Sequence, residues 1–333
     1  MRIVIDAMGS DHHPTPDVTG GVLAAREFGG TIILVGDQPQ IEAVLAGQDT
    51  AGLNIHIRHA SQKVEMTDKP SDILKHKLDS SMHVGLKLLK EGEADAFVTM
   101  GNTGAALGIA MLRQMGPGRI QGVKRPAIGV IFPIKEQPFL IDNGTNAECK
   151  PEYLLQFGVM GSLYVERMLG IQNPRVGLIS NGEEEGKGTV LLHEAAPLLA
   201  ASGLNFIGNV EPKEFMFGGV DVAVCDGFTG NILMKTAEAI AKYMSNQIRD
   251  ELMAGPITAV GGLLAKPAFA RVRKQLDPEE VGGAPLLGVN GVVIIGHGRS
   301  GAYAVKQAVG QARRMVEKRV VEAIVAGLQE SGQ

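Results

Sequence analysis

The stretch LISNGEEEGKGT, Leu178–Thr189, begins as an apolar strand and ends as a glycine-rich turn. An apolar run of this kind is typical of a strand that is covered on both faces of a sheet. The glycines and Lys187 are typical of a loop that binds phosphate, whereas the carboxylates Glu183–Glu185 would repel an anion. The stretch therefore predicts a buried strand, a polar loop and a helix, and it leaves open what the loop binds.

The same unit recurs along the chain and predicts an α/β fold. Apolar runs predict strands at 2–7, 31–37, 94–102, 126–133, 138–146, 175–182, 204–210, 220–227 and 291–298. Helices are expected at 16–29, 70–91, 103–113, 150–169, 189–202, 230–252 and 300–328. This alternation predicts a mostly parallel sheet flanked by helices, and a hairpin across 126–146 makes the sheet mixed. No repeat or linker divides the chain, so one domain over 1–333 is expected.

The composition excludes several classes of protein. The 333 residues include no Trp, aromatic residues make up 4%, and the formal net charge is −4. We therefore expect no binding to nucleic acid, because basic character and aromatic platforms are scarce. The start MRIVIDAMGS is too short an apolar run for a signal peptide, so a cytoplasmic protein is expected.

Reactive side chains are scarce as well. Cys149 and Cys225 give neither a disulfide framework nor a metal cluster, and the histidines form no H-E-x-x-H pattern. A G-x-S-x-G elbow is absent from the sequence. No metal and no cofactor are expected. Because no covalent nucleophile is evident, we expect a substrate such as inorganic phosphate to attack directly.

Polar glycine-rich loops follow six of the expected strands. They read DAMGSD, MGNTGA, IDNGTNAECK, ISNGEEEGKG, CDGFTGN and IGHGRSG. Ligands of parallel α/β sheets bind beyond the carboxyl ends of the strands. Six such loops on one edge of a sheet therefore predict a polar site of phosphate size. For any single loop, ordinary turn and helix-cap chemistry is the alternative, because it uses the same residue types.

Two of the loops come close to nucleotide-binding motifs without matching them. GHGRSG (296–301) has the G-x-G-x-x-G spacing, but no second strand with an acidic residue follows it. GEEEGKGT is one residue short of a Walker loop and has Gly188 where magnesium needs Ser or Thr. Neither a nicotinamide enzyme nor an NTPase is expected. The helix after GHGRSG still favours an anion, with His297 and Arg299 beside it. A structural turn histidine is the alternative.

A basic, apolar segment predicts a protruding helical arm at about 240–278. MAGPITAVGGLLAKPAFA (253–270) has one charge, and its prolines and glycines make it a poor membrane-spanning helix. Residues 242–274 hold six basic and two acidic residues, a net charge of +4. A glycine-bent hairpin of this kind suits an anionic membrane surface or an acidic partner. Packing of a dimer is the alternative. The residues expected to make these contacts are Lys242, Arg249, Leu263, Leu264, Lys266, Arg271, Arg273 and Lys274.

Six motifs together resemble one family. They are IDAMGSDHHP, MGNTGA, LIDNGTNAECKPEYLLQFG, SNGEEEGKGT, DGFTGNILMKT and GGAPLLGVNGVVIIGHGRS, and they span nearly the whole chain. In the same order, they resemble the bacterial phosphate acyltransferase family of phospholipid synthesis (PlsX). The resemblance implies a fold like that of isocitrate and isopropylmalate dehydrogenases and of phosphotransacetylases. It also implies a homodimer that associates peripherally with the membrane.

The resemblance further implies a reaction and its partners. Inorganic phosphate attacks the thioester of a long-chain acyl-[acyl carrier protein] in a reversible transfer. The acyl phosphate then passes to a membrane glycerol-3-phosphate acyltransferase. Because acyl carrier protein is acidic, the basic arm has a fitting partner. Two alternatives stay open: a phosphotransacetylase acting on a small acyl-CoA, and a non-enzymatic membrane scaffold that holds carrier protein.

On this resemblance, Lys187 and Asn231 are the expected catalytic residues, as donors to phosphate or to the tetrahedral oxyanion. Gly186 and Gly188 would let the backbone approach, and Glu184 would position Lys187 or act as a base. A solvated acidic loop is the alternative for this stretch. The residues expected to bind phosphate or the acyl thioester are Asp6, Gly9, Ser10, Asp11, Asn102, Thr103, Asp142, Asn143, Asn146, Asn181, Glu184, Gly186, Asp226, Thr229, Gly230, His297 and Gly298.

Overall fold

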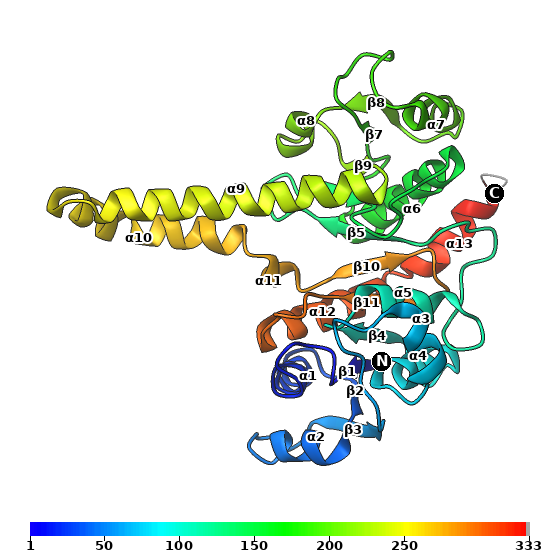
Figure 1. Ribbon diagram of the computed structural model, residues 1–333, viewed down its shortest axis with the longest axis vertical. Helices are drawn as coiled ribbons and strands as arrows, with labels where there is room; N and C mark the ends of the chain where they lie inside the picture. The colour runs from blue at the N-terminus through cyan, green and yellow to red at the C-terminus, as the bar shows by residue number, and fades with distance from the viewer. Residues whose placement is uncertain (331–333) are drawn as a thin grey trace.

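The computed structural model describes residues 1–330, apart from the side chains of Pro70, Pro278 and Glu330. These residues form one 11-stranded sheet in the order β3-β2-β1-β4-β11-β10-β5-β6-β9-β7-β8 (Figure 1). The strands are β1 (Arg2–Asp6), β2 (Thr31–Gly36), β3 (Asn54–His59), β4 (Ala96–Thr99), β5 (Ala127–Ile131), β6 (Phe139–Ile141), β7 (Val176–Ile179), β8 (Phe206–Val210), β9 (Val222–Val224), β10 (Ala284–Leu287) and β11 (Val292–Ile295).

Helices cover both faces of the sheet, as expected. They are α1 (Thr15–Phe28), α2 (Gln38–Leu45), α3 (Pro70–His76), α4 (Ser81–Lys90), α5 (Thr103–Met111), α6 (Pro151–Leu169), α7 (Val190–Ala200), α8 (Pro212–Met216), α9 (Gly227–Met253), α10 (Pro256–Gln275), α11 (Pro278–Val281), α12 (Ala302–Glu317) and α13 (Val320–Glu330). Neighbouring strand residues point to opposite faces, so Ile3 and Ile5 pack with α1 and α12, whereas Val4 packs with α4 and α5.

The direction of the strands reverses in the middle of the sheet. Strands β1, β4 and β11 run parallel to one another, and so do β6, β9 and β7. Between these groups, β10 is antiparallel to both β11 and β5, and β5 is antiparallel to β6. Three reversals leave the two groups pointing in opposite directions. The sheet is mixed and mostly parallel, as predicted, but the expectation that all six loops share one edge is wrong.

Several elements differ from the sequence-based expectation. The expected helix over 70–91 is two helices, because Ser80 begins α4 by accepting a hydrogen bond from the backbone N–H of His83. The expected helix over 300–328 also divides, at Arg319, whose φ is 52°. Strands β3 and β10 were not expected. Strand β10, APLL, is short and contains Pro285, and its place depends on pairing of Leu286 with Ile128 in β5.

Helices α9 and α10 form a hairpin that projects from the sheet, which agrees with the expected arm (Figure 1). The turn falls at Ala254–Gly255, and α10 continues through Gly261, Gly262 and Pro267, so the arm turns at Gly255 and is not broken at Gly261 or Gly262. No residue of α10 is buried, and Ile257 and Leu264 are 87% and 78% exposed. Among the helices of residues 1–330, none combines the length and apolar character that crossing a bilayer requires.

Candidate active site

The loops after β1, β4 and β11 form one cluster. The carboxylate of Asp6 accepts a hydrogen bond from the Thr99 hydroxyl at 2.8 Å. The backbone N–H of Asp11 donates to the carbonyl of Gly298 at 2.7 Å. A Cβ at Gly9 would lie 2.8 Å from Oγ1 of Thr99, so only glycine fits there. These contacts bring together three of the loops that the sequence singled out.

Two buried acids lie beneath this cluster. Burial raises the pKa of Asp6, although hydrogen bonds from Ser81 and Thr99 oppose the rise. Asp17 is fully buried, and its Oδ2 accepts from the Ser10 hydroxyl at 2.5 Å. Burial also raises the pKa of Asp17 well above its usual range. Asp6 and Ser10, which the sequence placed in the substrate pocket, therefore bond to neighbouring side chains that shape the loop.

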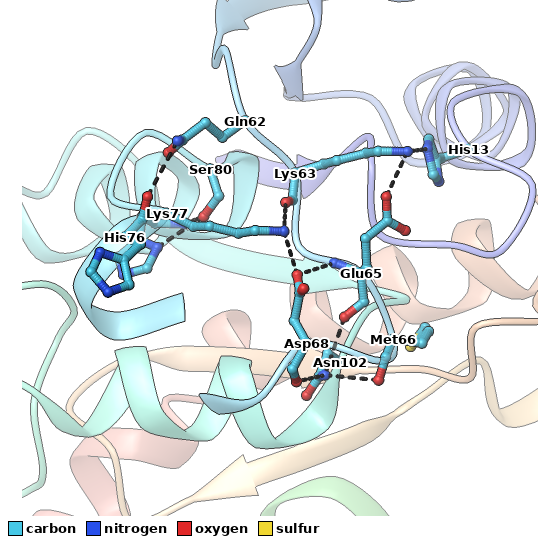
Figure 2. Close-up of polar contacts among 11 residues, drawn as sticks. His13, Gln62, Lys63, Glu65, Met66, Asp68, His76, Lys77, Ser80 and Asn102 are labelled. Carbon is cyan, nitrogen blue, oxygen red and sulfur yellow. Dashed lines mark hydrogen bonds and ion pairs between the residues drawn. The ribbon is translucent and has the colours of Figure 1, made fainter. Parts of the chain in front are cut away.

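Asn102 organises the entrance to α5 (Figure 2). Its Oδ1 accepts from the backbone N–H of Ala105 at 3.0 Å. Its Nδ2 donates to the carbonyls of Glu65 at 3.3 Å, Met66 at 3.2 Å and Asp68 at 3.2 Å. Asn102 was expected to bind substrate, but the hydrogen bonds of its side chain go to the backbone. It joins the segment 65–68 to the helix that begins at Thr103.

Ion pairs attach the segment 62–68 to further parts of the chain (Figure 2). Lys63 lies 2.8 Å from a carboxylate oxygen of Glu65 and 3.2 Å from Nε2 of His13, in the loop after β1. Lys77 pairs with Asp68 at 2.5 Å. The segment 62–68 is therefore joined to the loop after β1 and to both α3 and α5.

The loops after β6 and β9 form a second cluster. The carboxylate of Asp142 accepts from the backbone N–H groups of Gly144, Thr145 and Asn146 at 3.1, 2.7 and 2.7 Å. Burial raises the pKa of Asp142, and these hydrogen bonds oppose the rise. Asn146 accepts at its carbonyl from the N–H of Gly227, the first residue of α9, at 2.8 Å. The start of α9 is therefore fixed against the loop after β6.

The first turn of α9 places Asn231 beside this loop. Asp226 caps the helix by accepting from the N–H of Thr229 at 2.9 Å and from its hydroxyl at 2.8 Å. Asp226 and Thr229 thus bond to each other, although the sequence predicted them as substrate ligands. A Cβ at Gly144, whose φ is 136°, would lie 3.6 Å from Cγ of Asn231. The Asn231 amide is therefore next to a turn that exposes its backbone.

A cavity of about 650 Å³ lies between the two clusters. Thr103 and His297 line it from the first cluster, and Asn143, Gly144 and Asn231 line it from the second. Apolar side chains of β5 and α9 form much of the remaining wall. The two clusters lie on either side of β5 and β10, where the sheet changes direction, and residues of both line this cavity. Four of the expected site residues, Thr103, Asn143, Asn231 and His297, therefore meet there.

Lys235 also lines the cavity, and the sequence analysis missed it. It lies four residues after Asn231 on α9, and residues at this spacing share a helix face. The spacing of four residues from Asn231 is the feature of the sequence that could have identified Lys235. Its Nζ is 3.0 Å from a carboxylate oxygen of Glu238. Desolvation of the ring, together with the nearby charge of Lys235, lowers the pKa of His297.

Lys187 is not among the residues that line this cavity. It is exposed, on a loop that is fixed toward β8: Asn209 donates to the carbonyls of Glu184 at 3.0 Å and Lys187 at 3.2 Å. Asn181 is exposed too. A Cβ at Gly186 would meet nothing within 4 Å, so no close approach within the chain requires glycine there. The structure does not bring Lys187 and Asn231 into one cavity, and the catalytic role of Lys187 stays a prediction.

The two cysteine thiols are poor nucleophiles. Burial, together with the charges of Asp142 and Asp226, raises the pKa of Cys149 to about 12. Burial also raises the pKa of Cys225 well above its usual range. Both thiols are therefore protonated at pH 7, and the thiolate is the form that attacks. Attack by a bound substrate remains the simpler chemistry.

The expected arm contacts are all on the surface. The basic residues Lys242, Arg249, Lys266, Arg271, Arg273 and Lys274 are exposed, as are Leu263 and Leu264. Lys274 lies 3.7 Å from Glu280 at the base of the arm.

Comparisons with known proteins agree with the loop motifs. The family model described as "Fatty acid synthesis protein" matches residues 1–323. The phosphate acyltransferase of Syntrophotalea carbinolica is 46% identical over 98% of this chain and 93% of its own length. That of Alkaliphilus oremlandii is 46% identical over 100% and 98%.

Among solved structures, a phosphotransacetylase from Streptococcus pyogenes covers 97% of this chain and 94% of its own, with a TM-score of 0.63 and 14% identity. The EutD phosphotransacetylase from Staphylococcus aureus covers 94% of both chains, with a TM-score of 0.57 and 16% identity. These likenesses concern the fold alone, and they confirm that the chain has a fold like that of phosphotransacetylases, as predicted. From its loop motifs and its relatives, the chain belongs to the phosphate acyltransferase (PlsX) family of fatty acid synthesis proteins.

Proposed function

We propose that this acyltransferase moves a long-chain acyl group reversibly from acyl-[acyl carrier protein] to inorganic phosphate, giving acyl phosphate for phospholipid synthesis. The observation that supports this best is the cavity itself. Its lining includes the side chains of Asn143, Asn231 and Thr103 and the ion pair of Lys235 with Glu238, while the remaining wall is largely apolar. An anion at one end and a hydrocarbon chain at the other match the two parts of acyl phosphate.

The reaction needs no covalent intermediate on the protein. A phosphate oxygen forms a bond to the thioester carbonyl carbon, and the carbonyl oxygen becomes an oxyanion. The carbon–sulfur bond then breaks, the carrier thiolate leaves, and it takes a proton from solvent. The protein's part is to hold phosphate beside the carbonyl carbon and to stabilise the negative charge that develops.

Residues that line the cavity offer hydrogen-bond donors both for holding phosphate and for stabilising the oxyanion. Asn102 accepts from the N–H groups of Ala105 and Ala106, which leaves the first two N–H groups of α5 to face a ligand. These N–H groups and Lys235 would bind phosphate, because a helix N-terminus and a cation both favour an anion. Asn231 would donate to the oxyanion. Lys187 remains a predicted second donor.

The arm supports proposals about partners and location. Exposed cations on α9 and α10 suit the acidic carrier protein and anionic lipid, and exposed Leu263 and Leu264 suit the apolar boundary of a bilayer. We propose a cytoplasmic homodimer that binds peripherally to the membrane and passes acyl phosphate to a membrane glycerol-3-phosphate acyltransferase. Dimer packing through the arm is compatible with this.

A thiol-release assay tests the proposed reaction. Purified protein is mixed with palmitoyl-[acyl carrier protein], with and without inorganic phosphate, and with acetyl-CoA in parallel. We expect thiol release that requires phosphate and prefers the palmitoyl carrier. Release from acetyl-CoA alone would replace the proposal with a small-acyl phosphotransacetylase. Carrier binding without any release would replace it with a scaffold.

A further inference from the structure

The cavity continues well beyond its polar end. Apolar side chains from three elements line this continuation: Val130 of β5, Met216 of α8, and Met234 and Ala237 of α9. These residues pack against the buried cluster that contains Phe132 and Phe215, whose rings meet edge to face at 4.7 Å. The continuation therefore has a wall anchored in the core, with two flexible methionines that can adapt to different chains.

The length of this continuation can be read along α9. Residues from Asn231 to Ala241 line the cavity, and ten residues of helix rise about 15 Å at 1.5 Å per residue. The hydrocarbon core of a bilayer is about 30 Å thick, so one leaflet of lipid acyl chains spans about 15 Å. The cavity is therefore as long as one acyl chain of a membrane lipid.

The charged residues of α9 on the wall, Lys235 and Glu238, alternate with Met234 and Ala237. Lys235 and Glu238 line the cavity and pair at 3.0 Å, within two turns of Asn231. Past them the α9 residues on the wall are Ile240 and Ala241, and Leu276 faces them from the end of α10. Ile240 is 57% exposed and Leu276 is 39% exposed, so the far end opens at the base of the arm. An unbranched apolar chain with one anionic or ester end fits this distribution.

We propose that this continuation is the acyl-tail site, and that Ala237 and Val130 keep it wide enough for chains of lipid length. The proposal rests on the proposed function and names where its acyl group lies. Ala237 is six residues from Asn231, or about 9 Å along the helix. A larger side chain at Ala237 or at Val130 closes the site there, and a chain gains nothing from methylenes beyond that point.

The test measures how affinity depends on chain length. Binding of octanoate, laurate and palmitate is measured by calorimetry, alongside phosphate-dependent thiol release from the matching acyl carrier proteins. The variants are Ala237→Phe and Val130→Phe, from different walls, so that one can replace the other if it does not fold. Ala239→Phe is the matched control, because Ala239 is exposed on the same helix and does not line the cavity. Thermal melts establish that each variant is folded.

In the wild type and in Ala239→Phe, we expect affinity to rise from octanoate to palmitate. In Ala237→Phe and Val130→Phe, the affinity for palmitate should fall at least tenfold, while the affinity for octanoate should change less than about threefold. Only methylenes that are buried in the site contribute to binding. Equal loss for all three acids in a folded variant would overturn the proposal. Graded fatty-acid binding without thiol release in the wild type would retain the tail site and reject the proposed function.

Discussion

The backbone of Asp142 lies where a side chain at Gly230 would begin. A Cβ at Gly230 would overlap the carbonyl oxygen of Asp142 and approach the Sγ of Cys225 to 2.8 Å. The loop after β6 and the first turn of α9 are therefore in direct contact. This contact fixes Asn231, one residue later, against the turn at Gly144.

Substitution Gly230→Ala should separate these two elements. We expect a loss of about 1–3 kcal/mol in the free energy of unfolding, because overpacking a tight contact forces backbone shifts. Turnover should fall further than stability accounts for, because the shift moves Asn231. Gly261→Ala is the control: it lies within α10, its Cβ would meet nothing within 4 Å, and alanine there should stabilise the helix by up to about 1 kcal/mol. Stability is measured by chemical denaturation and activity by turnover, for both variants. A fully active Gly230→Ala would contradict this account of the contact.

Asp17 should make the fold less stable as pH rises from acid toward neutral. Its Oδ1 has no hydrogen-bond partner among the described residues, and burial raises its pKa well above the usual range. The folded protein therefore holds a proton that the unfolded chain releases near pH 4. Stability is highest below that pH and is lost as pH rises toward the folded pKa, because the unfolded state binds fewer protons.

Asp17→Asn should remove this dependence and raise the melting temperature near pH 7 relative to the wild type. Melting curves from about pH 4 to pH 8 measure the effect. Asp72→Asn is a suitable control, because Asp72 is exposed in the first turn of α3. If the melting temperatures of Asp17→Asn and the wild type changed in parallel with pH, the pKa of Asp17 would not be raised in the folded state, which would contradict this prediction.

The arm should bind anionic membranes through its apolar side chains. Leu263→Glu combined with Leu264→Glu should release the protein from anionic liposomes and largely spare turnover in solution, because both residues are exposed and distant in sequence from the cavity loops. Ser245→Glu combined with Gln247→Glu adds the same charge at exposed positions of α9 and should release it less. Liposome flotation measures binding. Unchanged binding of the leucine variant would assign the arm to dimer packing.

Part of the cavity lining was predictable because its loops have a distinctive composition. Glycine with Asp, Asn or Thr after an apolar strand marked the loops that contain Thr103, Asn143, Asn231 and His297, and all four line the cavity. The same composition also marks helix caps, so Asn102 and Asp226 were assigned to substrate although their side chains bond to neighbouring backbone and to Thr229. Composition alone does not separate these two uses.

The rest depended on contacts between distant segments. The reversal of the sheet needs β10, and its four residues APLL give no periodic signal. Lys187 and Asn231 follow the parallel neighbouring strands β7 and β9, so strand order alone places them at one edge, whereas the hydrogen bonds of Asn209 hold the Lys187 loop toward β8. Lys235 becomes a candidate only once α9 is known to lie along the cavity, because its sequence position resembles any exposed helical lysine.

The most direct test compares Asn231→Ala with Lys187→Ala in the palmitoyl-carrier assay. Because Asn231 lines the cavity, we predict that Asn231→Ala lowers kcat by about 10²–10³, as loss of one oxyanion donor does, with an unchanged melting temperature. The turnover of Lys187→Ala shows whether the exposed loop that contains Lys187 takes part in the reaction. Wild-type turnover in a folded Asn231→Ala variant would contradict the claim that the cavity between the two loop clusters is the active site.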